Sequence, residues 1–160
     1  MELLLLKATN EVNRNQKRVL FDKIRRRLGD DLSGKKVTLW GLAFKPRTDD
    51  MREAPALTIA ELLLAHGATV SAYDPVATHT ARVELGDRIT YCDDAYEALQ
   101  DADALALLTE WNEFRRPEWD DVTKRMRQPL VFDGRNIWDP MRVEQHGLEY
   151  YGIGRGRRLD

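Results

Sequence analysis

The sequence contains little cysteine, little histidine and no long apolar segment. It has one cysteine, Cys92, in 160 residues, which excludes an internal disulfide and a cysteine-based zinc site. The three histidines are scattered and lack the spacing of metal ligands. The opening run Leu3–Leu6 is far shorter than the roughly 20 apolar residues that cross a bilayer. Acidic Glu2 before it is not typical of a secretion signal. We therefore expect a cytoplasmic protein without a membrane segment.

The chain also lacks an excess of charge of either sign. Its 25 basic and 27 acidic residues leave a formal net charge of −2, which gives no general electrostatic reason to bind nucleic acid. Hydrophobic residues make up 42% of the sequence, a balance typical of a folded protein and not of a disordered one. A length of 160 residues suits one domain with a core of its own.

Residues 2–28 are predicted to form one long helix that ends at Gly29. Its apolar residues recur at helical spacing, at Leu5, Ala8, Val12, Val19, Leu20, Ile24 and Leu28. Basic residues gather in its second half, where the helix dipole favours cations. Such a helix either bridges to another domain or subunit or simply packs on its own domain, and both alternatives stay open.

Beyond the helix, short apolar segments alternate with helical patterns. Strands are predicted over residues 36–41, 69–73, 89–91, 104–108, 130–132 and 149–151. Helices are predicted over residues 55–66, 94–100, 117–127 and 140–145, and residues 155–158 are expected to be frayed. This alternation predicts an α/β fold: a doubly wound, Rossmann-like, mostly parallel sheet of about six strands, preceded by the long N-terminal helix.

In such a sheet, ligands bind beyond the carboxyl ends of the strands, where the strand order reverses. The loops at residues 41–54, 109–116 and 133–139 are therefore the candidates. The first is long for a strand-to-helix turn and lacks the GxGxxG pattern of a dinucleotide site. Its Phe44 and Lys45 suit a base, a sugar or a phosphate, although a core phenylalanine beside a solvated lysine is the alternative.

Two further side chains are predicted to lie near the same crevice. Arg135 follows the fifth strand and suits two-point contact with a phosphate, or else an ion pair with Asp49, Asp50 or Asp133. Asp74 ends the second strand, where a Rossmann domain places the acid that binds a ribose, but Asp74-Pro75 is equally an ordinary turn.

No complete catalytic site is predicted. Cys92 has no activating base nearby, and the adjacent Asp93 and Asp94 oppose thiolate formation. No Ser-His-Asp set or carboxylate pair is legible, and no metal site is expected. From the residues alone, the chain is a domain that binds an anionic ligand.

The first candidate loop carries a resemblance. The stretch VTLWGLAFKP at residues 37–46, continued by TDDMREAP at residues 48–55, closely resembles the signature of the nucleotide-sugar dehydrogenases, and within them the branch that acts on UDP-glucose. Further matches are AYDP at residues 72–75, TEW at 109–111 and FDGRN at 132–136. Val12-Asn13 with Gln16-Lys17 resembles the end of the family's central helix. The resemblance covers about residues 5–155.

The resemblance implies a function and a division of the chain. Such enzymes oxidise C6 of UDP-glucose to a carboxylate with two NAD⁺. Residues 1–30 would be the connecting and dimerisation helix segment, through which a homo-oligomer would form. Residues 31–160 would be the α/β domain that binds the UDP-sugar. The family's NAD fingerprint and nucleophilic cysteine do not occur in these 160 residues, and Cys92 lies in the wrong motif. The chain alone is therefore expected to be inactive.

Site residues are carried over one by one from the resemblance. Phe44, Lys45 and Arg135 would bind the substrate, UDP-glucose or UDP. Arg52 would lie near the NAD pyrophosphate. Asp49, Asp50 and Glu53 are expected to order the loop. Open alternatives are a domain of a UDP-N-acetylmannosamine or GDP-mannose dehydrogenase, or a non-catalytic nucleotide-binding or oligomerisation module.

Overall fold

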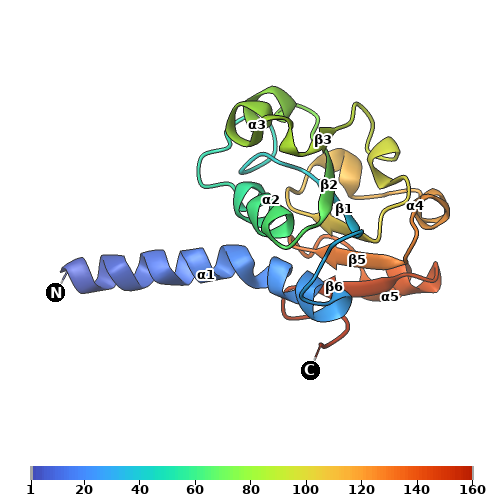
Figure 1. Cartoon of the computed structure of the whole chain (residues 1–160). Helices are drawn as coiled ribbons and strands as arrows, with labels where there is room; N and C mark the ends of the chain where they lie inside the picture. The colour runs from blue at the N-terminus through green and yellow to red at the C-terminus, as the bar shows by residue number, and fades with distance from the viewer. Residues whose placement is uncertain (1, 160) are drawn as a thin grey trace.

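A computed structural model of the chain describes residues 2–159 and begins with the long helix that the sequence predicts. Helix α1 spans Glu2–Leu28, and Gly29 ends it with a φ of +102°. Figure 1 shows that most of α1 projects away from the rest of the molecule. Across residues 2–159, no helix combines the length and the apolar character that a membrane crossing requires.

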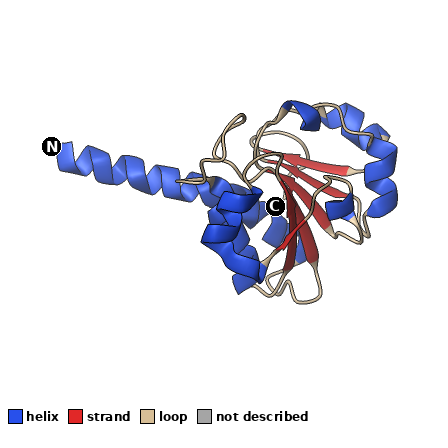
Figure 2. Cartoon of the chain, turned by 90° about the horizontal axis from the view of Figure 1, so that it is seen from above, coloured by secondary structure: helices blue, strands red, loops and turns tan. Residues whose placement is uncertain are grey.

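The sheet has six strands and is parallel throughout. The strands are β1 (Lys36–Trp40), β2 (Thr69–Tyr73), β3 (Thr90–Tyr91), β4 (Ala104–Leu107), β5 (Leu130–Asp133) and β6 (Glu149–Gly152). Their order is β3-β2-β1-β4-β5-β6, and helices cover both faces of the sheet (Figure 2). This is the strand order of a Rossmann fold, so the predicted architecture is confirmed. The order reverses between β1 and β4.

The connections contain four further α-helices and three 3₁₀ turns. The helices are α2 (Pro55–Ala65), α3 (Thr78–Leu85), α4 (Trp119–Arg125) and α5 (Pro140–Gln145), and the turns are η1 (Gly86–Arg88), η2 (Glu97–Leu99) and η3 (Asn112–Phe114). The sequence did not predict α3, which buries only Ala81 and Leu85 and therefore has little apolar periodicity. The helix expected over residues 94–100 is only the turn η2, which begins where the Asp94 carboxylate accepts two backbone N–H groups.

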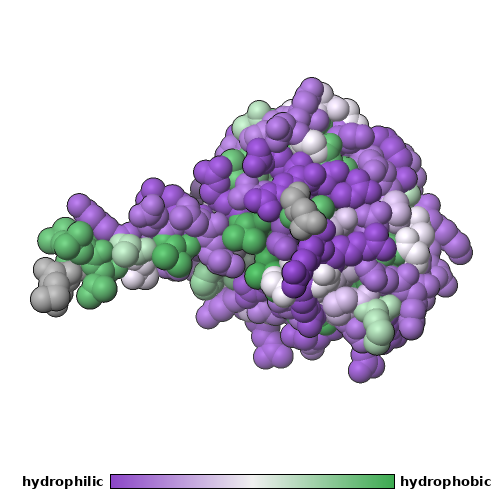
Figure 3. Space-filling view, turned by 90° about the horizontal axis from the view of Figure 1, so that it is seen from below, coloured by the Kyte–Doolittle hydropathy of each residue, from purple (hydrophilic) through white to green (hydrophobic). Residues whose placement is uncertain are grey.

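Helix α1 is divided between the core and the solvent. Leu20, Phe21 and Ile24 are buried, and the last turns of α1 pack beside α2 and β5. The four leucines from Leu3 to Leu6 are 63–73% exposed, and Figure 3 shows them as an apolar tip. Of the apolar residues that recur at helical spacing in α1, Ile24 belongs to the core of this domain, whereas Leu5 and Val12 are exposed.

Residues 155–157 contact the rest of the domain, where the sequence suggested a frayed segment. Gly156 forms an antiparallel bridge with Tyr151. The Arg155 guanidinium donates a hydrogen bond to the carbonyl of Trp138, and the Arg157 guanidinium pairs with Glu144 at 2.8 Å. The arginines of this segment bond to residues 13 and 17 positions earlier in the chain. The local sequence, rich in glycine and arginine, does not indicate such contacts.

Gly41 makes a specific prediction possible, because it leaves β1 with a φ of +90° where the chain passes very close to Thr109. A Cβ atom at residue 41 would lie 2.5 Å from Cβ of Thr109 and 2.7 Å from its backbone nitrogen. Gly41→Ala is therefore expected to lower the free energy of unfolding by at least about 2 kcal/mol, through backbone strain and steric overlap together. Urea denaturation followed by circular dichroism measures the loss.

Gly34→Ala is the matched control. Gly34 also has a positive φ, +76°, but nothing lies within 4 Å of the added Cβ. It is expected to lose only the backbone contribution, about 1 kcal/mol. Equal losses in the two variants would show that the close approach to Thr109 is unimportant.

Candidate functional site

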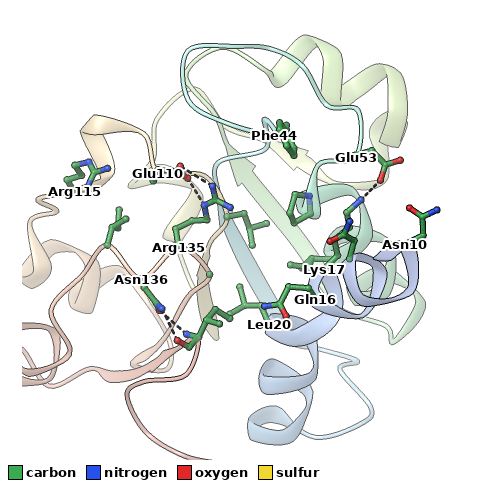
Figure 4. Close-up of a pocket in the computed structure, with 17 residues that line it drawn as sticks. Asn10, Gln16, Lys17, Leu20, Phe44, Glu53, Glu110, Arg115, Arg135 and Asn136 are labelled. Carbon is green, nitrogen blue, oxygen red and sulfur yellow. Dashed lines mark hydrogen bonds and ion pairs between the residues drawn. The ribbon is translucent and has the colours of Figure 1, made fainter. Parts of the chain in front are cut away.

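A cleft of about 1000 Å³ opens beyond the carboxyl ends of β1, β4 and β5. All three loops that the sequence singled out contribute to it. Phe44 and Glu53 come from the loop after β1, Glu110 and Arg115 from the loop after β4, and Arg135 from the loop after β5. Figure 4 shows these side chains around one opening. The topology therefore brings functional side chains from three separate stretches of sequence to one cleft.

The buried carboxylate of Asp74 organises the floor of this region. It follows β2 and is only 4% exposed. Its Oδ2 accepts hydrogen bonds from the backbone N–H groups of Leu42 and Ala43, at 2.7 and 3.0 Å, and from the indole of Trp111 at 3.2 Å. Its Oδ1 accepts from the backbone N–H groups of residues 76 and 77. Asp74 is thus occupied inside the protein and is not free to bind a ribose.

The rest of the loop after β1 is closed by its own polar groups. The N–H of Phe44 donates to the carbonyl of Asp50 at 2.8 Å. The Asp50 carboxylate accepts from the backbone N–H and the guanidinium of Arg52, and these hydrogen bonds hold the pKa of Asp50 below its ordinary value. Asp49 accepts a long hydrogen bond from Thr80. Of the acids that the resemblance assigns to ordering this loop, Asp50 bonds within it, whereas Asp49 contacts Thr80 of α3.

The predicted ligand-binding residues of this loop differ in their placement. Phe44 is 46% exposed and lines the cleft, so it is not a core residue. Lys45, the next residue, is exposed and does not line the cleft. Arg52 is also exposed and outside the cleft, and its guanidinium pairs with Asp50 at 3.0 Å. The structure brings Phe44 and Arg135 together, but it does not bring Lys45 or Arg52 into the same cleft.

Arg135 lies on a rigid turn and has one carboxylate partner. Its N–H donates to Oδ1 of Asp133 at 3.0 Å, while Oδ2 of the fully buried Asp133 accepts from Trp138 and Tyr150. Its guanidinium pairs with Glu110, from Nε to Oε2 at 2.5 Å and from Nη2 to Oε1 at 3.0 Å. These hydrogen bonds hold the pKa of Glu110 below its ordinary value. The alternative reading of Arg135, an ion pair with Asp49, Asp50 or Asp133, is therefore wrong in its partner, which is a glutamate of the neighbouring loop.

One wall of the cleft comes from α1, and the sequence did not predict it as part of the site. Asn10, Asn13, Gln16, Lys17 and Leu20 all line the cleft. The ammonium of Lys17 forms an ion pair with Glu53, and that hydrogen bond lowers the pKa of Glu53. Glu53 itself has a φ of +60°, unusual for a residue with a side chain. The three- and four-residue spacing of the polar face of α1 is the signal that could have indicated this wall.

Cys92 remains apart from the cleft. Burial, followed by the nearby carboxylate of Glu97, raises the pKa of the Cys92 thiol and makes it a poor nucleophile. Within residues 2–159, no three side chains of His, Cys, Asp or Glu gather in a way that could hold a metal ion. The cleft offers amides, an aromatic ring and the cations Lys17, Arg115 and Arg135, of which Lys17 and Arg135 are paired with glutamates.

Comparison with known proteins identifies the family to which this chain belongs. Residues 38–140 match the sequence model described as UDP-glucose/GDP-mannose dehydrogenase family, UDP binding domain. The chain belongs to this family. The matched segment runs from β1 to the start of α5 and includes all three loops of the cleft.

Similar proteins extend the match to nearly the whole chain. The UDP-glucose 6-dehydrogenase of Pseudomonas aeruginosa is 44% identical over 158 residues, which cover 96% of this chain and 35% of that protein. The enzyme of the same name from Rhizobium meliloti is 42% identical, over 94% of this chain and 34% of that protein. The solved UDP-glucose dehydrogenase of Pyrobaculum islandicum aligns with a TM-score of 0.78 and 33% identity, over 95% of this chain and 32% of that one. The chain spans about a third of the length of the relatives it matches.

The role of Asp74 can be tested by removing its charge. Asp74→Asn keeps one acceptor oxygen but turns an amide N–H₂ toward donors that it cannot satisfy, namely backbone N–H groups or the indole of Trp111. We expect a loss of about 3 kcal/mol in the free energy of unfolding. Thermal and urea denaturation measure it.

Asp139→Asn is the control for this substitution. Asp139 caps α5 from an exposed position and accepts one backbone hydrogen bond, from Met141. Asparagine caps helices about as well as aspartate, so a loss well below 1 kcal/mol is expected. If Asp74→Asn were equally mild, the carboxylate would not be what holds the loop after β1.

Proposed function

We propose that this chain binds the UDP part of a UDP-sugar in the cleft between the loops after β1, β4 and β5. The observation that carries the proposal is the meeting of an exposed aromatic ring, Phe44, and a guanidinium, Arg135, across one opening of about 1000 Å³. An aromatic face suits a base or a sugar, and a planar guanidinium suits a diphosphate. The UDP binding domain of the family and its UDP-glucose 6-dehydrogenases support the choice of nucleotide.

Phe44, Lys45 and Arg135 would contact different parts of the ligand. The ring of Phe44 would pack against the uracil or the sugar, while Arg135 would form two-point hydrogen bonds with the diphosphate. Lys45, exposed beside Phe44, would add a mobile charge at the edge of the ligand. Because Lys45 lies outside the cleft, its contact would be weaker than that of Arg135.

The residues present do not form a dinucleotide site of their own. The turn after β1 lacks the glycine pattern that admits a pyrophosphate, and Asp74 is occupied by internal hydrogen bonds. In a complete NAD-dependent enzyme, NAD would be bound mainly by residues other than these 160. The exposed Arg52 guanidinium would supply one contact, near the NAD pyrophosphate.

We further propose that the chain serves a UDP-glucose 6-dehydrogenase. In that reaction UDP-glucose, two NAD⁺ and water give UDP-glucuronate and two NADH with the release of protons. The chain would supply the nucleotide half of the substrate site. It would be inactive alone, because the nucleophilic cysteine and the NAD fingerprint do not occur in its sequence. A cytoplasmic location and a homo-oligomer formed through α1 belong to the same proposal.

Nucleotide binding is the first outcome to measure. In an NMR titration of the labelled chain, UDP is expected to shift the resonances of Phe44, Lys45 and Arg135, and NAD⁺ is not. GDP is expected to bind more weakly than UDP, which separates the UDP-sugar assignment from the GDP-mannose alternative. Absence of any shift with millimolar UDP would contradict the proposal.

Two substitutions test the assigned residues. Arg135→Ala is expected to weaken UDP binding by about 1–3 kcal/mol and Lys45→Ala by an amount near the lower end of that range. The larger effect of Arg135→Ala follows because the substitution also leaves Glu110 unpaired beside the ligand. Arg116→Ala removes an exposed cation that does not line the cleft and is the control. Unchanged affinity in both test variants would refute the assignment.

The exposed end of α1 leads to a prediction about association. Leu5 and Val12 lie two helical turns apart, and both are more than 60% exposed. The chain is expected to self-associate in sedimentation, and Leu5→Glu with Val12→Glu is expected to abolish this. Val83→Glu, which removes an equally exposed apolar residue from α3, is the control. A clean monomer at high concentration would show that α1 does not mediate association.

A further inference from the structure

The guanidinium of Arg135 is held from one side only. Glu110 accepts hydrogen bonds from Nε at 2.5 Å and from Nη2 at 3.0 Å, which is the side edge of the group. A guanidinium carries five N–H donors, so this pair leaves three of them, two on Nη1 and one on Nη2. Within residues 2–159, Nη1 has no hydrogen-bond partner. The end edge of the guanidinium, formed by Nη1 and Nη2, therefore remains available as a second two-point donor.

That end edge faces the open part of the cleft. Figure 4 shows Glu110 and Arg135 together at one wall, with Phe44 and Lys17 across the opening. Because the group is planar and Glu110 lies against Nε and Nη2, Nη1 is directed away from Glu110, on the side of Arg135 that Figure 4 shows nearer to Phe44 and Lys17. A phosphate in the cleft could therefore meet Nη1 and Nη2 without displacing Glu110.

The backbones that carry the two side chains are fixed, which leaves only the side chains to be oriented. The N–H of Gly134 donates to the carbonyl of Leu107 at 2.9 Å, and a Cβ at residue 134 would lie 2.7 Å from that same oxygen. On the other side, the buried Thr109 hydroxyl donates to the carbonyl of Ala43 at 2.6 Å. The side chains of Arg135 and Glu110, 34% and 26% exposed, reach the cleft from these fixed backbones, and their pairing restricts the rotamers that each can adopt.

We infer that Glu110 is a positioning residue for diphosphate recognition: it holds the side edge of the Arg135 guanidinium so that the end edge is presented to the ligand. This inference rests on the proposed binding of UDP in the cleft. Glu110 does not touch the ligand in this arrangement. It removes the rotational freedom of Arg135 before the ligand arrives, so that less of that freedom is lost on binding.

A contrary role makes the opposite prediction. If Glu110 only competed with the diphosphate for Arg135, its neutralisation would tighten UDP binding. If it positions Arg135, its neutralisation loosens UDP binding, although one negative charge has been removed from the neighbourhood of an anion. The sign of the change in affinity therefore separates the two roles.

The experiment compares UDP with uridine in the wild-type chain and in Glu110→Gln, by NMR titration. Glu110→Gln is expected to weaken UDP binding by about five- to tenfold and to leave uridine binding within twofold, since uridine carries no phosphate for Arg135. The Nε–H resonance of Arg135 is expected to lose its hydrogen-bonded shift in the variant. Glu118→Gln, which removes the same charge outside the cleft, is the control and is expected to change neither affinity.

A second background isolates the positioning role from any effect on folding. In Arg135→Lys the side chain has a single charged nitrogen and no second edge to present, so adding Glu110→Gln is expected to have no further effect on UDP binding. Glu110→Asp, which keeps the charge but is one methylene shorter, is expected to lie between wild type and Glu110→Gln. If Glu110→Gln does not fold, Glu110→Asp replaces it as the test variant, and weaker UDP binding than in the wild type is the expected result.

The outcomes distinguish the inference from the proposed function. If the wild-type chain binds UDP and Glu110→Gln binds UDP equally well or more tightly, the positioning role is overturned but the proposed function stands. So does an equal loss for UDP and uridine, which would indicate a general structural effect. If the wild-type chain binds UDP no better than uridine, the proposed function fails, and this inference fails with it.

Discussion

The buried carboxylate of Asp74 is the interaction on which the geometry of the cleft depends. One of its oxygens accepts from two consecutive backbone N–H groups after β1 and from the indole of Trp111 after β4. Two separate loops are thereby tied to the end of β2. A buried charge is costly unless it is fully hydrogen-bonded, and here five donors satisfy it. The positions of Phe44 and Glu110 follow from this arrangement.

The same carboxylate distinguishes this Rossmann strand order from that of a dinucleotide-binding domain. In a dinucleotide-binding domain, the acid after the second strand is free for a ribose, and glycines after the first strand admit a pyrophosphate. In this chain the acid points inward and the loop after β1 presents side chains instead. The cleft therefore lies farther out, toward β4 and β5, where Glu110 and Arg135 line it.

Much of the fold follows from local sequence, because the central strands are buried on both faces. The run ALAL of β4 is buried at every position, so its apolar character alone indicates a strand. Topology then places the loops after β1, β4 and β5 at one edge, which is why they could be selected in advance. Helix α3 escaped prediction because it buries only two residues and offers no clear periodicity.

The finer details of the site depend on contacts between distant residues. Glu110 and Arg135 are 25 positions apart, and their pairing follows from the adjacency of β4 and β5 together with the length of a glutamate. The alternative aspartate partners are one methylene shorter, and two of them are already bonded, Asp133 to Trp138 and Tyr150 and Asp50 to Arg52. Nor could the helical pattern of α1 say which of its turns this domain covers.

Helix α1 joins two environments in one rigid rod. Its 27 residues span about 40 Å at the usual rise per residue. The buried end, at Phe21 and Ile24, is fixed in the core, the middle carries Lys17 on the cleft wall, and the far end is in solvent. Because Lys17 belongs to the same rod as Phe21 and Ile24, the packing of those two side chains in the core fixes where the α1 wall of the cleft stands.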